Sequence, residues 1–359
     1  MNLPTPRLEI YPERISSNAR TVINLCHAHR AQIAGVAKVV SAHPAVVSAL
    51  ASAGVDMLAD ARLSNLRAIS ELRLGLPLML LRIPSPSAAD EVVRLAEYSL
   101  NSSVETMQAL SAAARAIGVQ HRVIVMLDLG DLREGVWPDR ALDVVSQVSR
   151  FPNLEISGLG SNLACFGGVL PDANNMQSLV ELRDACRQVT GLDLNLISGG
   201  SSVNLPLLAK GDIPCEVNHL RIGETILLGC NVIDRSPWPG TRQDAFRVVA
   251  EVIELERKPS LPIGQRGPDA FGGFTEFVER GIRKRAICNI GRQDVVVDGL
   301  QPEDPGIIVL GGSSDHLVLD VQDAQSGLHL GSEIAFSPNY GALLAASTSS
   351  YVEKVVMKG

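Results

Sequence analysis

The sequence predicts a (β/α)8 barrel of the TIM type followed by a C-terminal domain that is mainly β. Two observations support this fold class. As far as about residue 230, short apolar runs alternate with segments of helical periodicity, which is typical of a parallel sheet buried on both faces. After a connector that contains proline and glycine (residues 234–244), strand-like runs follow one another without comparable helical spacing. We therefore expect the barrel at residues 9–235 and the β domain at residues 236–359, to which residues 1–8 can add a strand.

Eight apolar runs are expected to become the barrel strands, and helical patterns separate them. The strands are expected at residues 33–39, 55–59, 78–83, 98–101, 122–128, 155–162, 194–198 and 219–223. The clearest helical patterns lie at residues 43–53, 63–73, 103–118 and 176–191. Eight strand–helix units in succession are what a closed (β/α)8 barrel requires.

The expected β domain consists of strand-like runs that lie close together. They are residues 246–256, 285–291, 294–300, 307–312, 316–323 and 333–337. The opening residues 7–12 are strand-like as well and can join this domain.

Composition and charge exclude several classes of protein. The net charge of -7 argues against a surface for nucleic acid or anionic membranes, and the basic cluster at residues 280–285 is too short for a binding stripe. No run approaches the ~18 apolar residues of a membrane span, and the N-terminus lacks the apolar segment of a signal peptide. The six cysteines show no CxxC pair or regular spacing, so we expect reduced thiols of a cytoplasmic protein and no metal site.

A lysine embedded in an apolar run is the first candidate for chemistry. Lys38 stands among valines near the end of the first expected strand. In barrels of this type, active residues come from the carboxyl ends of the strands and the loops beyond them. The alternative is a lysine whose ammonium group reaches solvent at the barrel mouth without a chemical role.

Glycines and serines cluster at the ends of the seventh and eighth expected strands. They are Gly199, Gly200, Ser201, Ser202 and Gly223. Backbone N–H groups and hydroxyls in such loops bind anions, and the loops after strands seven and eight are the usual phosphate site of barrels. Each motif alone is also typical of an ordinary turn. Together with a lysine on the first strand they place an amine and a phosphate site in one mouth, and pyridoxal 5′-phosphate requires both.

Arg221, at the end of the eighth expected strand, is placed to face the ring of such a cofactor. A guanidinium does not give up its proton, so an arginine that donates to the pyridine nitrogen keeps that nitrogen unprotonated. The ring is then a weaker electron acceptor, which favours simple removal and return of a proton at Cα. The alternative is a structural arginine in a salt bridge at the barrel rim.

These motifs occur in the order found in a known family. The segments AGVAKVV (34–40), SGGSS (198–202) and LRIG (220–223), with a following β domain, resemble the alanine-racemase-like, fold-type III pyridoxal-phosphate enzymes. The similarity is greatest to their branch of ornithine and lysine racemases. Further segments typical of this branch are residues 58–66, 79–84, 126–135, 258–264, 280–286, 311–317 and 340–352. The resemblance implies a barrel and a β domain that assemble as a head-to-tail homodimer with shared active sites.

The resemblance also implies roles for single residues. Lys38 matches the lysine that holds the cofactor as a Schiff base and acts as a base at the substrate Cα. Arg221 matches the arginine that faces the pyridine nitrogen, where decarboxylases of the same fold carry a glutamate. The glycines and serines of the two loops match the phosphate cradle. Other matches are Asn162 beside the ring, Arg133 as a substrate-orienting residue, and Tyr340 and Tyr351 near the phosphate.

One departure from the family leaves the second proton acceptor open. Alanine racemase uses a tyrosine from the partner's β domain, whereas the matching stretch here, residues 260–267, contains none. Inversion requires a proton acceptor and donor on the opposite face of the substrate. The candidates are Ser314, Asp315 and His316, which align with the partner-supplied loop of fold-type III decarboxylases, and His43 is a further one.

A basic amino acid carries a distal ammonium group that needs a carboxylate partner. Asp315 matches the aspartate that receives the far end of a diamine in the decarboxylases, and Asp269 is a second candidate. We therefore expect a two-base racemase of a basic amino acid, ornithine first and lysine or arginine next. The alternatives are a fold-type III decarboxylase of a basic amino acid, against which Arg221 argues, and a non-catalytic pyridoxal-phosphate carrier, which would have no use for the β domain.

Overall fold

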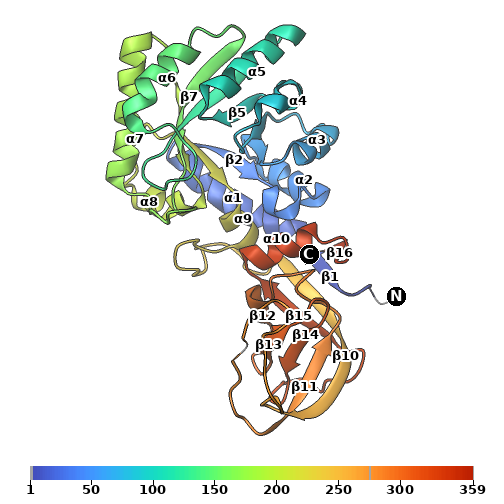
Figure 1. Cartoon of the computed structure of the whole chain (residues 1–359). Helices are drawn as coiled ribbons and strands as arrows, with labels where there is room; N and C mark the ends of the chain where they lie inside the picture. The colour runs from blue at the N-terminus through green and yellow to red at the C-terminus, as the bar shows by residue number, and fades with distance from the viewer. Residues whose placement is uncertain (1–2, 275, 359) are drawn as a thin grey trace. The chain divides into compact units, whose positions relative to one another are not determined.

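The computed structural model of this chain describes residues 3–274 and 276–358. The chain divides into two compact units (Figure 1). One unit runs from Pro12 to Gln243, and the other combines the segment up to Tyr11 with the chain from Asp244 onward. The boundary expected from the sequence, at residue 235, lies earlier, in the loop that follows the last barrel helix.

The unit that starts at Pro12 is a closed barrel of eight parallel strands, which confirms the predicted fold class. In chain order its strands are β2 (Gln32–Val36), β3 (Met57–Asp60), β4 (Leu78–Leu80), β5 (Tyr98–Asn101), β6 (His121–Leu127), β7 (Leu154–Ser161), β8 (Leu196–Gly200) and β9 (His219–Ile222). Each expected run overlaps one of these strands, because a strand buried on both faces requires an almost continuous apolar segment.

Helices alternate with the strands and lie outside the barrel (Figure 1). They are α1 (Pro12–Ala28), α2 (Pro44–Ala53), α3 (Leu63–Glu71), α4 (Ala89–Leu95), α5 (Val104–Ile117), α6 (Ala141–Val148), α7 (Ala173–Thr190), α8 (Leu205–Lys210) and α9 (Glu224–Leu228). Local sequence sets their ends: Ser103 accepts the N–H of Thr106 at the start of α5, and Gly118 ends that helix with a φ of 70°. Among the helices of the described residues, none is long and apolar enough to cross a membrane.

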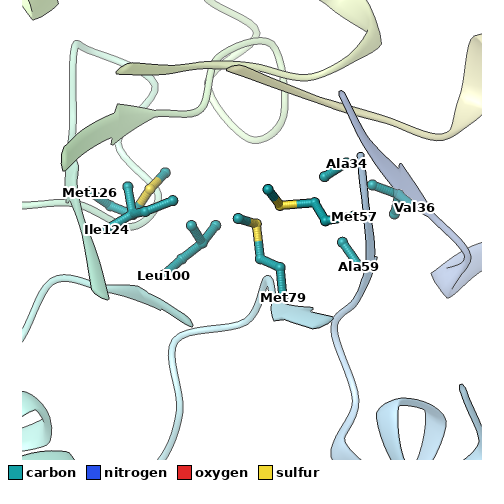
Figure 2. Packing of buried hydrophobic residues seen from close by; sticks show 8 residues of the cluster. All are labelled: Ala34, Val36, Met57, Ala59, Met79, Leu100, Ile124 and Met126. Carbon is teal, nitrogen blue, oxygen red and sulfur yellow. The ribbon is translucent and has the colours of Figure 1, made fainter. Parts of the chain in front are cut away.

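Apolar side chains fill the middle of the barrel (Figure 2). The cluster consists of Ala34, Val36, Met57, Ala59, Met79, Leu100, Ile124 and Met126. Alternate residues of a strand point to the same side, so β2, β3 and β6 each contribute two residues that are two positions apart, and β4 and β5 contribute one each. The unbranched methionine side chains fit the irregular space at the barrel axis. Because the middle is packed, a ligand must bind at one end of the barrel.

The other unit is the predicted, mainly β domain. Its sheet has the strand order β12-β15-β10-β11-β14-β13, and β1 pairs with β10 and β16. The strands are β1 (Arg7–Ile10), β10 (Phe246–Pro259), β11 (Ile282–Cys288), β12 (Leu300–Pro302), β13 (Ile308–Gly312), β14 (Leu317–Asp320), β15 (Glu333–Pro338) and β16 (Glu353–Val356). A helix, α10 (Tyr340–Thr348), follows the N-cap residue Asn339, whose side chain accepts the N–H of Ala342.

Buried charges fasten β1 within this unit. Arg7 donates to both carboxylate oxygens of Glu333, at 2.8 and 2.7 Å, and to Glu9 at 2.9 Å. The hydroxyl of Tyr11 donates to the other oxygen of Glu9 at 2.8 Å. Arg7 is only 5% exposed, so these acceptors replace the water that its guanidinium loses on folding. The ion pair ties β1 to β15 across the intervening strand β10.

The prediction of a strand at residues 294–300 is wrong. Val297–Gly299 form a 3-10 turn, and β12 starts only at Leu300. The carboxylate of Asp294 accepts the N–H of Gly291 at 3.0 Å and stabilises the turn that precedes them. The apolar run reflects the burial of Val295 and Val297, whereas Val296 is exposed, and not an extended backbone.

Candidate active site

Lys38 lies just beyond the carboxyl end of β2, at the first position of a 3-10 turn (Lys38–Val40). Strand β2 itself ends at Val36, before the lysine. Ser41 and Ala42 have φ values of 50° and 53°, so the chain reverses direction tightly after the turn. The lysine thus stands on a closely defined backbone at the mouth of the barrel.

The pKa of Lys38 lies below the ordinary lysine value. Desolvation is the largest cause, and the guanidinium groups of Arg133 and Arg221 lower the pKa further, whereas Cys165 and Asp60 raise it. The side chain is exposed at the barrel mouth, so solvent and small molecules reach it although protein surrounds much of its length. A lowered pKa increases the fraction of neutral amine, which is the form that acts as a base or nucleophile.

Arg221 of β9 points into the barrel, because it pairs with the inward-facing Ala34 of β2. It is 5% exposed. Its Nη1 donates to the Oγ of Ser198, and its Nη2 donates to the backbone oxygen of Ser161 at 2.7 Å and to Oδ1 of Asn162 at 3.4 Å. Burial lowers the pKa of Arg221 to about 10. Uncharged oxygens therefore hold this guanidinium inside the barrel, and the described residues show no salt bridge to it.

Arg133 and Asn162 lie in the loops that follow β6 and β7. Arg133 forms a bidentate pair with Glu134, and its Nη1 also donates to the Sγ of Cys165. The carboxylate of Asp131 accepts the N–H groups of Cys165, Phe166 and Val169 and so fixes the second loop. The structure therefore brings Lys38, Arg133, Asn162 and Arg221 to the same end of the barrel.

Close packing explains the glycines at the end of β8 and directly after β9. A Cβ on Gly199 would lie 2.4 Å from the nearest side-chain atom, and one on Gly200, where φ is 146°, would lie 2.2 Å from Oδ1 of Asn204. A Cβ on Gly223 would lie 3.1 Å from the backbone oxygen of Val36. Side chains at these positions would overlap neighbouring protein atoms and displace the backbone at the barrel mouth.

Hydroxyl groups flank these glycines. The Oγ of Ser202 accepts the N–H of Thr225 at 3.3 Å, which joins the loop after β8 to the start of α9. The hydroxyl of Ser201 makes no hydrogen bond within the described part of the chain and stays available to a ligand. The loops after β8 and β9 adjoin each other, are rich in glycine and carry this hydroxyl of Ser201. These features suit the binding of a phosphate group.

Some neighbours of the expected residues were not predicted. Ser198 and His219 lie in a chain with Arg221, with the Oγ of Ser198 at 2.7 Å from Nδ1 of His219. The two-residue spacing of His219 and Arg221 was a signal in the sequence, because residues two apart share one face of a strand. Cys165 carried no comparable signal, since its contact with Arg133 joins two loops that are distant in sequence.

Ser314, Asp315 and His316 form the turn between β13 and β14 of the other unit. The Oδ1 of Asp315 lies 2.9 Å from Nδ1 of His316 and accepts from the Oγ of Ser314 at 3.2 Å. The hydrogen bond with His316 lowers the pKa of Asp315. The side chains of His316 and Asp315 are 43% and 58% exposed, so both are open to a partner.

Asp269 lies beside this turn. Its Oδ1 accepts the N–H groups of Phe271 at 2.9 Å and Gly273 at 2.8 Å, and its Oδ2 lies 4.0 Å from Arg292. The backbone N–H of Arg292 donates to the oxygen of Ser313 at 2.9 Å, which makes the two segments neighbours. Asp269 is therefore engaged in its own turn, whereas Asp315 has fewer backbone contacts.

The other residues that the sequence predicted for the site, Tyr340, Tyr351 and His43, lie in or beside helices α10 and α2. Tyr340 is the first residue of α10 and is partly buried, and Tyr351, beyond the end of that helix, is 69% exposed. His43 precedes α2 as its N-cap residue, which is a helix-start position. Within the described ranges, no three His, Cys, Asp or Glu side chains are grouped to hold a metal ion.

A cavity of about 680 Å³ lies at the opposite, amino-terminal end of the barrel. Its lining includes Gln32, Tyr98 and Arg122, which lie at the starts of their strands. The guanidinium of Arg122 stacks on the ring of Tyr98 and pairs with Glu155 at 3.2 Å. The apolar cluster fills the barrel between this cavity and Lys38, so the cavity is no part of the candidate site.

Comparisons with known proteins agree with this geometry. The family model for the N-terminal domain of alanine racemase matches residues 10–231. An ornithine racemase from Acetoanaerobium sticklandii is 39% identical over 98% of this chain and 99% of its own length, and a lysine racemase from Thermotoga maritima is 38% identical over 98% of both. An alanine racemase structure from Clostridium difficile 630 has a TM-score of 0.75 at 17% identity, covering 100% of this chain and 97% of that one, and so shares the fold. The chain belongs to the alanine racemase family.

Proposed function

We propose that this protein is a pyridoxal 5′-phosphate-dependent racemase that interconverts the L and D forms of a basic amino acid, with ornithine as the first candidate and lysine or arginine next. The observation that carries the proposal is the presence of Lys38 and Arg221 at one barrel mouth, an amine of lowered pKa near a buried guanidinium. The similarity to an ornithine racemase and a lysine racemase over almost the whole chain supports the same class of reaction.

The residues of the barrel fit this cofactor. When bound, pyridoxal 5′-phosphate withdraws electrons from the substrate Cα and so makes its proton easier to remove. Lys38 offers an amine for the aldehyde, and the hydroxyl of Ser201 with the close-packed glycine loops offers a site for the phosphate. Arg221 has one further donor, its Nε–H, which makes no hydrogen bond within the described residues. This donor suits an unprotonated ring nitrogen, because a guanidinium keeps its proton.

Lys38 is the proton acceptor and donor that we assign to one face of the substrate Cα. Racemisation requires a second such group on the opposite face. We assign that role to the turn of Ser314, Asp315 and His316, in which the carboxylate and imidazole are hydrogen-bonded to each other and open to solvent. An imidazole can accept and release a proton, and the carboxylate of Asp315 orients the ring of His316.

A homodimer in which each β unit completes the barrel of the other copy follows from this assignment. Exposed apolar side chains in both units support it. At the barrel mouth they are Leu132, Phe166 and Leu170, and in the β unit they are Ile263, Phe271, Phe274 and Val278. Association would remove these side chains from water, which contributes roughly 25 cal/mol per Å² of apolar area.

Asp315 is our candidate for the distal ammonium of the substrate. A buried or half-buried ammonium needs a carboxylate to offset its lost hydration. The carboxylate of Asp269 already accepts the backbone N–H groups of two other residues, whereas that of Asp315 accepts from side chains of its own turn. Asp269 is therefore the second choice for this role.

We also propose a cytoplasmic location. All six cysteines are free thiols. Cys165 and Cys215 are exposed, and exposed thiols persist where the compartment is reducing.

Proton exchange at Cα tests the proposed function. Purified protein loaded with pyridoxal 5′-phosphate is incubated with L-ornithine in D2O, and loss of the Cα–H signal is followed by NMR together with optical rotation. Racemisation gives exchange with decay of rotation to zero and no new amine. Release of a diamine would contradict the proposal in favour of decarboxylation, and neither reaction with ornithine, lysine or arginine would exclude a racemase of these substrates.

A further inference from the structure

Three polar side chains form a hydrogen-bonded chain that runs from the candidate site into the barrel. Arg221 donates from Nη1 to the Oγ of Ser198, and this Oγ lies 2.7 Å from Nδ1 of His219. A guanidinium can only donate, so the Ser198 hydroxyl accepts from Arg221 and donates its own hydrogen to Nδ1. The proton of the neutral imidazole is therefore on Nε2.

His219 is fully buried, and its surroundings keep it neutral. Burial, with a smaller contribution from Arg221, lowers the pKa of His219 to about 3. Its Nε2 has no hydrogen-bond partner within the described residues. A buried N–H group without an acceptor destabilises the fold, and an apolar side chain would avoid this cost. The benefit of a histidine here lies in its other nitrogen, which accepts from Ser198.

We propose that Ser198 and His219 are positioning residues, which lock the guanidinium of Arg221 so that its Nε–H is presented to the cofactor ring nitrogen. This inference rests on the proposed function, since it concerns how the same site holds pyridoxal 5′-phosphate. The hydroxyl of Ser198 fixes Nη1, and the backbone oxygen of Ser161 fixes Nη2 at 2.7 Å. With both Nη atoms held, the plane of the guanidinium is set. His219 orients the hydroxyl, because its Nδ1 can only accept.

The barrel contains a second buried pair that serves as a matched control. The Oγ of Ser99 lies 2.7 Å from Nε2 of His121, and Asn101 donates to this Oγ at 2.8 Å. His121 is 1% exposed, and burial lowers its pKa to about 4. The hydrogen-bond order is the same, from donor to serine to histidine, but the donor is an amide and not Arg221. Breaking this pair perturbs the fold without touching the arginine.

The experiment compares Ser198→Ala, His219→Leu, His219→Asn and Ser99→Ala with the unaltered protein. The dissociation constant of pyridoxal 5′-phosphate is measured by titrating cofactor-free protein, and the absorption maximum of the bound cofactor and the Tm are recorded. Ser198→Ala and His219→Leu are expected to weaken binding roughly tenfold, about the effect of one hydrogen bond from a charged donor, and to shift the absorption maximum. His219→Asn keeps an acceptor for Ser198 and is expected to restore most of the affinity. Ser99→Ala is expected to lower the Tm only.

Unchanged affinity and spectrum in both Ser198→Ala and His219→Leu would overturn the inference, as would an equal loss in Ser99→Ala. A second readout needs no cofactor. In ¹⁵N-histidine NMR of the cofactor-free protein, the resonance absent from His219→Asn is expected to show the neutral Nε2–H form throughout about pH 5 to 8, the range in which an ordinary histidine titrates. Titration of His219 in that range would overturn the proposed positioning role independently of cofactor binding. Failure of the unaltered protein to bind pyridoxal 5′-phosphate would instead contradict the proposed function.

Discussion

Arg133 and Cys165 join the loop after β6 to the loop after β7, because Nη1 of the guanidinium donates to the sulfur at 2.5 Å. The two residues act on Lys38 in opposite directions, since Arg133 lowers its pKa and Cys165 raises it. A contact between two loops thus sets part of the basicity of the residue that we propose as the catalytic amine.

Opposite shifts of the Lys38 pKa are therefore expected from two substitutions. Arg133→Met removes a positive neighbour, which makes the ammonium form less unfavourable and raises the pKa. Cys165→Ser removes a neighbour with negative character and lowers it. The measurement is the pH dependence of reductive methylation of Lys38 in cofactor-free protein, located by mass spectrometry. Shifts in the same direction for both variants would show that the loop contact does not control this amine.

Lys38→Ala is expected to abolish the stable attachment of pyridoxal 5′-phosphate and to slow Cα exchange by about a thousandfold or more, because the variant lacks both the amine and the proton acceptor. Absorbance after gel filtration measures the attachment, and D2O exchange measures the rate. Lys210→Ala, an exposed lysine at the end of α8, is the control and is expected to behave like the unaltered protein. A Lys38→Ala protein that still carries the absorbance of an attached cofactor would remove Lys38 from the proposed role.

The barrel was predictable because each strand is a continuous apolar run, and such a run is a local property of the sequence. The place of Lys38 at the carboxyl end of the first barrel strand followed from the same pattern. The prediction of a strand at residues 294–300 was wrong because Val295 and Val297 are buried in a turn, and an apolar run indicates burial without requiring an extended backbone. The partners of Arg221 were not predictable, since its contact with Ser161 depends on the register of strands that close the barrel.

The conformation of Gly200 predicts a specific sensitivity to alanine. Its φ of 146° lies in a region that side chains rarely adopt, and an added Cβ would lie 2.2 Å from Oδ1 of the buried Asn204. Gly200→Ala is therefore expected to cost about 2–4 kcal/mol of unfolding free energy and to weaken binding of pyridoxal 5′-phosphate. Gly191→Ala is the control, because φ is 70° there but nothing lies within 4 Å, so about 1–2 kcal/mol and unchanged binding are expected. Equal costs in urea unfolding would refute the steric explanation.

The ion pair of Arg7 and Glu333 predicts a loss of stability that depends on pH. Arg7→Ala leaves Glu333 without its cation and the buried Glu9 with only Arg247, at 3.7 Å. We expect a loss of about 2–4 kcal/mol at neutral pH, less than for a fully buried pair because Glu333 is 39% exposed. Lys258→Ala, in an exposed pair with Glu254 on β10, is the control and is expected to cost under about 1 kcal/mol.

The sign of the pH dependence follows from Glu333. The hydrogen bond from Arg7 lowers the pKa of Glu333 in the folded protein below its ordinary value of 4.5. The unfolded chain therefore takes up a proton at higher pH than the folded one, so the contribution is complete above pH 4.5 and is lost as the pH falls through the lowered folded pKa. In urea unfolding, the difference in unfolding free energy between the unaltered protein and Arg7→Ala is expected to stay constant from neutral pH down to about pH 4.5. Below that pH it is expected to shrink. A difference that does not change under acid conditions would mean that packing of the Arg7 side chain, and not its charge, holds β1.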